Sequence, residues 1–185
     1  MEKELKRKAA EKMDSAIEML KKEFSAIRTG RASLALLDGI KVDYYGTPTP
    51  LQQLASLSIP ESRQIAIQPW EQKIISEIEK AIMKSDLGLT PSNDGKVIRI
   101  NIPALTEERR KQLVKVTKKN AEDSRIVIRN IRRDINEEIK KLEKEKHLSE
   151  DNTKKSLDEI QKLTDTYIKK IDDILMHKEK EIMEV

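Results

Sequence analysis

The chain of 185 residues contains no cysteine and only five aromatic residues: one tryptophan, one phenylalanine and three tyrosines. The lack of cysteine excludes disulfides and thiolate metal sites, and it is compatible with a reducing compartment. Scarce aromatics argue against a reader of single-stranded nucleic acid, because such proteins stack bases on aromatic rings. No apolar run reaches the length of a membrane span or of a signal-peptide core. We therefore expect a soluble, cytoplasmic protein with no membrane partner.

Signatures of catalysis are also scarce. The sequence contains neither a GxxxxGK[ST] loop nor a GxGxxG loop for phosphate groups. His147 and His177 have no metal-ligand partner at helical spacing, and no nucleophile is paired with a base and an orienting group. We expect no enzymatic activity, no metal and no cofactor, and a hydrolase built on the central segment is the weakest alternative.

Charge and helical periodicity are abundant, since 38% of the residues are charged. Apolar residues recur every three or four positions in three segments, so each segment has one buried stripe, as in a helical bundle. The first segment runs from Leu5 to Ile27 and the third from Leu157 to Ile182. The stripe of the second segment is predicted to contain Leu113, Val116, Ile128, Ile131, Ile135, Ile139 and Leu142.

Two boundaries frame the second and third helices. Pro103 blocks a backward extension of the second helix, and Thr106 is a suitable N-cap. Ser149 is the predicted N-cap of the third helix. The short break before Ser149 predicts an antiparallel turn between two long helices.

The segment between Gly30 and Pro103 has a different pattern. It contains strand-like stretches at 40–44, 57–59, 64–67 and 97–102, a helical stretch at 71–84, and a turn signal at 92–95. Thr47 to Pro50 is expected to form a rigid turn or an edge segment, because proline cannot donate a ladder hydrogen bond. Tyr44 and Tyr45 are expected on opposite faces of a strand, and core packing is expected to explain at least one of them, as well as Trp70.

The predicted fold class is α+β: an elongated three-helix bundle made by residues 1–30 and 105–185, with a small β/α/β domain inserted at 31–104. The chain then crosses between domains twice, at Thr29-Gly30-Arg31 and at Pro103-Ala104-Leu105. Gly30 can adopt backbone angles that other residues avoid, so the two crossings could act as a hinge. A rigid, well-packed junction remains equally open.

The positive charge is concentrated in residues 106–133, which make up most of the second long helix. Residues 106–133 contain ten Lys/Arg and four Asp/Glu, whereas residues 134–185 contain eleven and fifteen. Arg125, Arg129 and Arg132 fall within about 60° of one another on a helix, off the apolar stripe, with Arg133 next to them. Arginine binds phosphate bidentately, so these residues predict a face for structured RNA or DNA backbone.

Two alternatives to a nucleic-acid face remain. The arginines could form salt bridges to acidic groups on the third helix. The protein could also be a helical adaptor whose basic face docks an acidic partner protein, and salt dependence and nuclease sensitivity would separate that case from phosphate binding.

Six long motifs in one order carry a resemblance to a known family. They are IRTGRAS at 27–33, VDYYGTPTPLQQLAS at 42–56, EKAIMKSDLGLTPSNDG at 79–95, LTEERRKQL at 105–113, IRNIRRD at 128–134 and QKLTDTYIKKID at 161–172. In these motifs, and almost from end to end, the chain closely resembles the ribosome recycling factors. Thr90 stands where the family pattern suggests asparagine, and Ile126 and Ile128 are bulkier than expected.

The resemblance implies an L-shaped monomer in which a flexible hinge joins the bundle to the inserted domain. It implies binding to the post-termination 70S ribosome at the large subunit, followed by splitting with elongation factor G and GTP. The GTPase is then the partner, which agrees with the missing phosphate loop. By resemblance, Arg129 and Arg132 clasp ribosomal RNA, with flanking contacts from Arg28, Arg31, Arg109, Arg110, Arg125 and Arg133.

Overall fold

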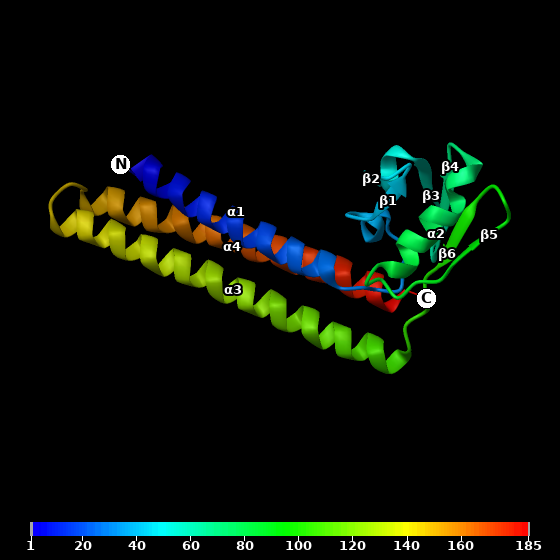
Figure 1. Cartoon of the computed structure of the whole chain (residues 1–185). Helices are drawn as coiled ribbons and strands as arrows, with labels where there is room; N and C mark the ends of the chain where they lie inside the picture. Colours follow the sequence, from blue (N-terminus) through cyan, green and yellow to red (C-terminus); the bar gives the residue numbers. More distant parts are fainter. Residues whose placement is uncertain (1, 185) are drawn as a thin grey trace. The chain divides into compact units, whose positions relative to one another are not determined.

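The structure is a computed structural model that describes residues 2–184 (Figure 1). Contacts between residues divide the chain into two compact units. The first contains the residues up to Arg28 and those from Glu107 onward, and the second contains Thr29–Thr106. The helices of the first unit and the small sheets of the second make this an α+β protein, the predicted class.

Three long helices form the first unit: α1 (Glu2–Ala26), α3 (Glu107–Lys144) and α4 (Glu150–Met183). Each helix packs against both of the others, and Figure 1 shows the three running side by side. Their shared core includes Met13, Leu20, Ile128, Ile135 and Ile171, which are fully buried. At 1.5 Å per residue, α3 is about 57 Å long. The prediction of three amphipathic bundle helices is confirmed.

The turn between α3 and α4 forms as the sequence predicts. Ser149 is the N-cap of α4, and its hydroxyl accepts a hydrogen bond from the Asn152 backbone N–H at 3.3 Å. Lys146, in the same turn, has a positive φ of 57°. The cap satisfies one of the amide groups that a helix N-terminus leaves without a partner.

The predicted buried stripe of α3 is wrong at one position. Val116 is 46% exposed, whereas its neighbour Thr117 is fully buried. The stripe runs from Leu113 through Thr117 and Ala121 to Ile128. The Thr117 hydroxyl is compatible with the core because it donates a hydrogen bond to the Val114 carbonyl at 2.9 Å.

The second unit contains two antiparallel sheets, one helix and three short 3-10 turns. A four-stranded sheet has the order β3-β4-β6-β5, and β1 pairs with β2 in a separate hairpin. The elements are β1 (Lys41–Tyr44), β2 (Thr47–Pro50), β3 (Ala55–Glu61), β4 (Gln64–Pro69), α2 (Ile75–Lys84), β5 (Pro91–Asn93) and β6 (Ile98–Asn101), with 3-10 turns at Leu34–Leu37, Leu51–Gln53 and Gln72–Ile74.

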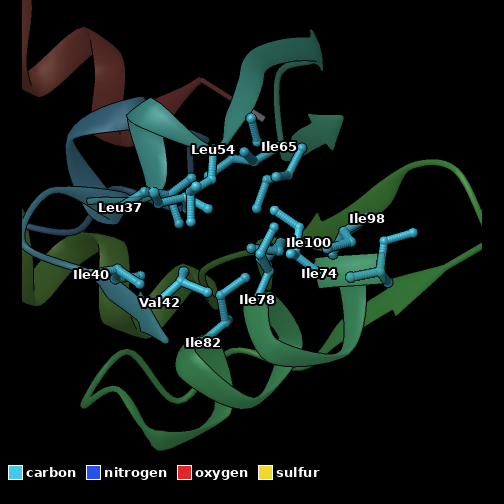
Figure 2. Packing of buried hydrophobic residues seen from close by; sticks show 14 residues of the cluster. Leu37, Ile40, Val42, Leu54, Ile65, Ile74, Ile78, Ile82, Ile98 and Ile100 are labelled. Carbon is cyan, nitrogen blue, oxygen red and sulfur yellow. The ribbon is translucent and has the colours of Figure 1, made fainter. Parts of the chain in front are cut away.

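The core of this unit forms between α2, the hairpin and the larger sheet. Figure 2 shows Ile82 of α2 beside Val42 of β1 and Ile78 of α2 near Ile100 of β6, and Ile98 of β6 belongs to the same cluster. All five side chains are completely buried. The unit therefore has a hydrophobic core of its own, as a separately packed domain requires.

The predicted strands at 40–44, 57–59, 64–67 and 97–102 are present, and Thr47–Pro50 is an edge strand. The helical stretch at 71–84 divides into a 3-10 turn and α2. The turn signal at 92–95 is partly wrong, since Pro91–Asn93 forms β5 and the turn itself begins at Asp94. Asp94 Oδ1 accepts hydrogen bonds from the Lys96 and Val97 amides, so the turn residues lie two positions later than expected.

The expected placement of the aromatic residues is wrong in two cases. Tyr45 does not continue β1; with Gly46 it forms the hairpin turn, and both residues have positive φ. Trp70 is 70% exposed and does not belong to the core. Ile65, Ile67 and Pro69 of β4 are the buried positions, so the alternation along the strand points the tryptophan outward.

Candidate RNA-binding surface

The candidate surface consists of Arg125, Arg129, Arg132 and Arg133 on α3. These residues lie beside the buried stripe that Ile128 and Ile131 contribute to the bundle core. Arg129 and Arg133 are exposed, and Arg125 and Arg132 are half-buried. Because the stripe fixes the rotation of the helix, it also fixes the direction in which the four arginines project.

Arg125 is tied to the neighbouring helix. Its Nη2 and Nε atoms donate to Asp172 Oδ1 on α4 at 2.6 and 3.0 Å, and its Nη1 atom donates to Glu122 at 3.0 Å. Burial lowers the pKa of Arg125, but the hydrogen bonds to Asp172 and Glu122 outweigh it and raise the pKa overall. The salt-bridge alternative therefore holds for Arg125, whose charge is compensated within the bundle.

Glu122 compensates part of a second charge. Arg129 Nη1 donates to Glu122 Oε1 at 3.0 Å, so the two oxygens of one carboxylate serve two arginines. Hydrogen bonds from Arg125 and then Arg129 lower the pKa of Glu122. Arg129 remains 44% exposed, so water or a ligand can still reach its guanidinium group.

Arg132 is positioned without being neutralised. Its Nη1 atom donates to the neutral amide oxygen of Gln161 on α4 at 3.0 Å, and Gln161 Nε2 donates in turn to Asp165 at 2.8 Å. Within residues 2–184, neither Arg132 nor the exposed Arg133 forms a salt bridge. The pattern of helix periodicity placed the arginines correctly, but it gave no indication of Gln161, which holds Arg132 from the adjacent helix.

The remaining predicted contacts lie elsewhere. Arg110, on the first turn of α3, is about 33 Å along the axis from Arg132 and about 40° away around it, whereas Arg109 is about 140° away. Arg109 Nη1 donates to Gln112 at 3.2 Å. Arg28 follows α1 in the first unit, and Arg31 belongs to the second unit. The structure thus brings Arg125, Arg129, Arg132 and Arg133 together, with Arg110 distant on a similar face.

Two features are absent from residues 2–184. No group of three or more His, Cys, Asp or Glu side chains is arranged to hold a metal ion. None of the helices in that range is long and apolar enough to cross a membrane.

Comparison with known proteins extends over nearly the whole sequence. A family model described as Ribosome recycling factor matches residues 20–183. The ribosome-recycling factor of Oleidesulfovibrio alaskensis is 61% identical over 175 residues, which cover 95% of each chain. That of Halothermothrix orenii is 57% identical over 185 residues and covers 100% of both chains.

Solved structures give a similar result. A solution structure of a ribosome recycling factor covers 100% of this chain and 98% of its own, with 45% identity and a TM-score of 0.76. A second structure presents models for the T. thermophilus ribosome recycling factor and the E. coli elongation factor G bound to the E. coli post-termination complex. That factor covers 100% of both chains, with 48% identity and a TM-score of 0.64.

Proposed function

The chain belongs to the ribosome recycling factor family, and on that premise we propose that it recycles ribosomes after termination. It binds the post-termination ribosome at the large subunit and, with elongation factor G and GTP, splits it into subunits. Messenger RNA and deacylated tRNA are released for a new round of translation. The protein acts in the cytoplasm as a monomer without a cofactor and is itself not an enzyme, because GTP hydrolysis belongs to elongation factor G.

The uncompensated pair Arg132 and Arg133 supports the RNA-binding part of this proposal most strongly. Both arginines are on a helix that is packed along its length, so a phosphate contact at this point is made by a stiff body. The other six predicted arginines, Arg28, Arg31, Arg109, Arg110, Arg125 and Arg129, contribute flanking contacts. Arg125 contributes least, because Asp172 and Glu122 already occupy its guanidinium group.

The proposed lever is the inserted domain, residues 31–104, which elongation factor G pushes relative to the bundle. The two chain crossings are both attached to the turn between β3 and β4. The Ala32 amide donates to the Ser62 carbonyl and the Ile102 amide donates to the Arg63 carbonyl, each at 2.8 Å. These bonds confine the proposed hinge to the few residues between them and the bundle helices.

Those few residues are the proposed hinge: Thr29, Gly30, Arg31, Pro103, Ala104 and Leu105. Gly30 has a φ of +77°, a conformation that costs other residues about 1 kcal/mol or more. A Cβ atom on Gly30 would lie 3.2 Å from Leu105 Cγ and 3.4 Å from the Leu105 backbone nitrogen. The two crossings therefore touch each other at a glycine, which supports a paired hinge and predicts that a larger residue there stiffens it.

Sedimentation of post-termination ribosomes through a sucrose gradient tests the proposed function. Ribosomes incubated with this protein, a bacterial elongation factor G, GTP and an anti-reassociation factor should separate into subunits. Omission of this protein, of elongation factor G or of GTP should leave them intact. Intact ribosomes in the complete mixture would contradict the proposal.

Binding to isolated large subunits tests the arginine surface separately. Loss of one charge-assisted contact costs about 1.5–3 kcal/mol, so Arg132→Ala should weaken binding by about tenfold or more. Arg7→Ala is the matched control, because Arg7 is an exposed arginine on α1 that pairs with Glu11, one turn away on the same helix. Equal affinities of the two variants would remove Arg132 from the binding surface.

A further inference from the structure

Three of the five aromatic residues of the chain lie close together on the second unit, Thr29–Thr106, called the inserted unit below. Tyr44 ends β1, Tyr45 is in the following turn, and Trp70 directly follows β4. Trp70 is 70% and Tyr45 is 75% exposed. The rings of the two tyrosines meet edge to face, with 4.7 Å between their centroids. Exposed tryptophan and tyrosine are enriched in protein interfaces, so this cluster is a candidate contact surface.

A carboxylate organises the cluster. The Tyr44 hydroxyl donates to Glu71 Oε1 at 2.7 Å, and the Tyr45 hydroxyl donates to Glu71 Oε2 at 3.2 Å. These hydrogen bonds raise the pKa of both tyrosines, so both hydroxyls remain donors well above neutral pH. Tyr45 reaches Glu71 because the positive φ of the hairpin turn redirects its side chain. The Glu71 carboxylate is thus held by two tyrosine hydroxyls.

A surface cavity opens beside this group. It is lined by Tyr44, Trp70 and Glu71, with Leu54 and Ile74 among the apolar walls, and its volume is about 230 Å³. Sites for drug-sized ligands occupy about 300–1,000 Å³, so this cavity suits a single side chain. A carboxylate beside aromatic side chains attracts a cation and repels phosphate.

We propose that this cavity receives an arginine or lysine side chain of a partner protein. The charge of the inserted unit favours protein over RNA: residues 29–106 contain eight Lys/Arg and eight Asp/Glu, so the excess positive charge of the chain lies in the bundle. Leu54 and Ile74 accommodate the aliphatic stem of the guest while Glu71 meets its head group. The identity of the partner protein is the one part of this proposal that rests on the proposed function. On that function, the partner is a protein that the inserted unit contacts on the ribosome.

Trp70 provides a built-in reporter, because it is the only tryptophan of the chain. The full chain is titrated with Nα-acetyl-arginine methylamide, and the Trp70 fluorescence and indole N–H resonance are followed. Nα-acetyl-glutamine methylamide serves as the neutral probe and AMP as the nucleotide probe. Glu71→Gln removes the charge while keeping the shape, and Glu77→Gln is the matched control, since Glu77 is on α2 outside the cavity and pairs with Lys80.

The expected result is a saturable response to the arginine probe that is at least about fivefold weaker in Glu71→Gln and unchanged in Glu77→Gln. An equal response to the neutral probe, an equal affinity in Glu71→Gln, or a stronger response to AMP would overturn the proposal. The last outcome would make the cluster a base-stacking surface.

A splitting assay with Trp70→Ala and Glu71→Gln connects the cavity to the ribosome. Slower splitting by both variants, at unchanged thermal midpoint, is expected. If the wild-type protein binds the arginine probe but does not split ribosomes, the proposed function is contradicted and the cavity assignment is supported. If both variants split ribosomes normally and the wild-type protein does not bind the arginine probe, only the cavity assignment is contradicted.

Discussion

Arg125 and Arg132 are two turns apart on α3, yet the structure gives them different roles, and their alanine variants should separate those roles. Arg125 is 19% exposed and makes three hydrogen bonds to two carboxylates. Buried hydrogen bonds to charged groups are each worth about 1.5–3 kcal/mol. Asp172 is 53% exposed, and screening by solvent reduces that figure. We expect Arg125→Ala to destabilise the bundle by about 1–2 kcal/mol, and a chain of this size loses about 2–4 °C per kcal/mol.

Arg132 donates one exposed hydrogen bond to a neutral amide, so Arg132→Ala should cost about 0.5 kcal/mol, the lower end of the range for one hydrogen bond. Thermal unfolding followed by far-ultraviolet circular dichroism measures both variants, because the signal is dominated by the bundle helices. The midpoint should fall by about 2–8 °C for Arg125→Ala and by about 2 °C at most for Arg132→Ala. A double-mutant cycle with Asp172→Ala isolates the coupling between the two helices. Equal midpoints, or a coupling of zero, would refute the assignment of Arg125 as a tie between α3 and α4.

Burial, and then the hydrogen bond to a neighbouring carboxylate, raise the pKa of Tyr167 from 10 to about 12. Its contribution to stability is therefore constant below about pH 10 and falls as the pH rises toward 12; denaturant midpoints of wild type and Tyr167→Phe should converge across that window, and parallel curves would count against the buried hydrogen bond. Ile135→Ala should cost about 2–5 kcal/mol because Ile135 is fully buried, whereas Val116→Ala should change the unfolding free energy by about 0.5 kcal/mol or less; urea titrations measure both, and similar losses would place Val116 in the core after all. Gly30→Ala should slow ribosome splitting more than it weakens large-subunit binding, because φ is +77° at the proposed hinge; an equal loss in both assays would favour a rigid junction.

The long helices could be predicted from the sequence because their apolar stripes repeat over many turns and their ends carry recognisable caps. The stripe assignment failed at Val116, where the buried position is Thr117. Apolarity alone favours valine, but the rotation of the helix is decided by packing along its whole length. A threonine can occupy the core there because its hydroxyl bonds within its own helix.

The predictions for Tyr45 and Trp70 in the second unit were wrong, although the sequence contains local signals for both positions. Tyr45-Gly46 is a two-residue hairpin turn, which the glycine and the flanking strands indicate. The buried alternation of Ile65 and Ile67 places Trp70 on the outer face if it is continued to the end of the strand. The general expectation that large aromatics are buried outweighed both local signals.

The candidate surface was predictable in position but not in charge balance. Helical geometry places Arg125, Arg129 and Arg132 on one face, and they are there in the structure. Whether a given arginine is compensated depends on which residue of α4 lies opposite, and helix register across a bundle is a property of tertiary packing. Asp172 lies opposite Arg125 and Gln161 lies opposite Arg132, and this difference is what assigns them separate roles.

Stopped-flow light scattering tests most directly whether the protein splits ribosomes and whether Arg132 binds it to the large subunit during splitting. Post-termination ribosomes are mixed with elongation factor G, GTP, an anti-reassociation factor and either wild type, Arg132→Ala or Arg7→Ala, with each protein below saturation. A fall in scattering that is fast for wild type and Arg7→Ala, and at least about tenfold slower for Arg132→Ala, is the predicted result. Equal rates for all three proteins would contradict the role of Arg132, and constant scattering with every protein would contradict recycling itself.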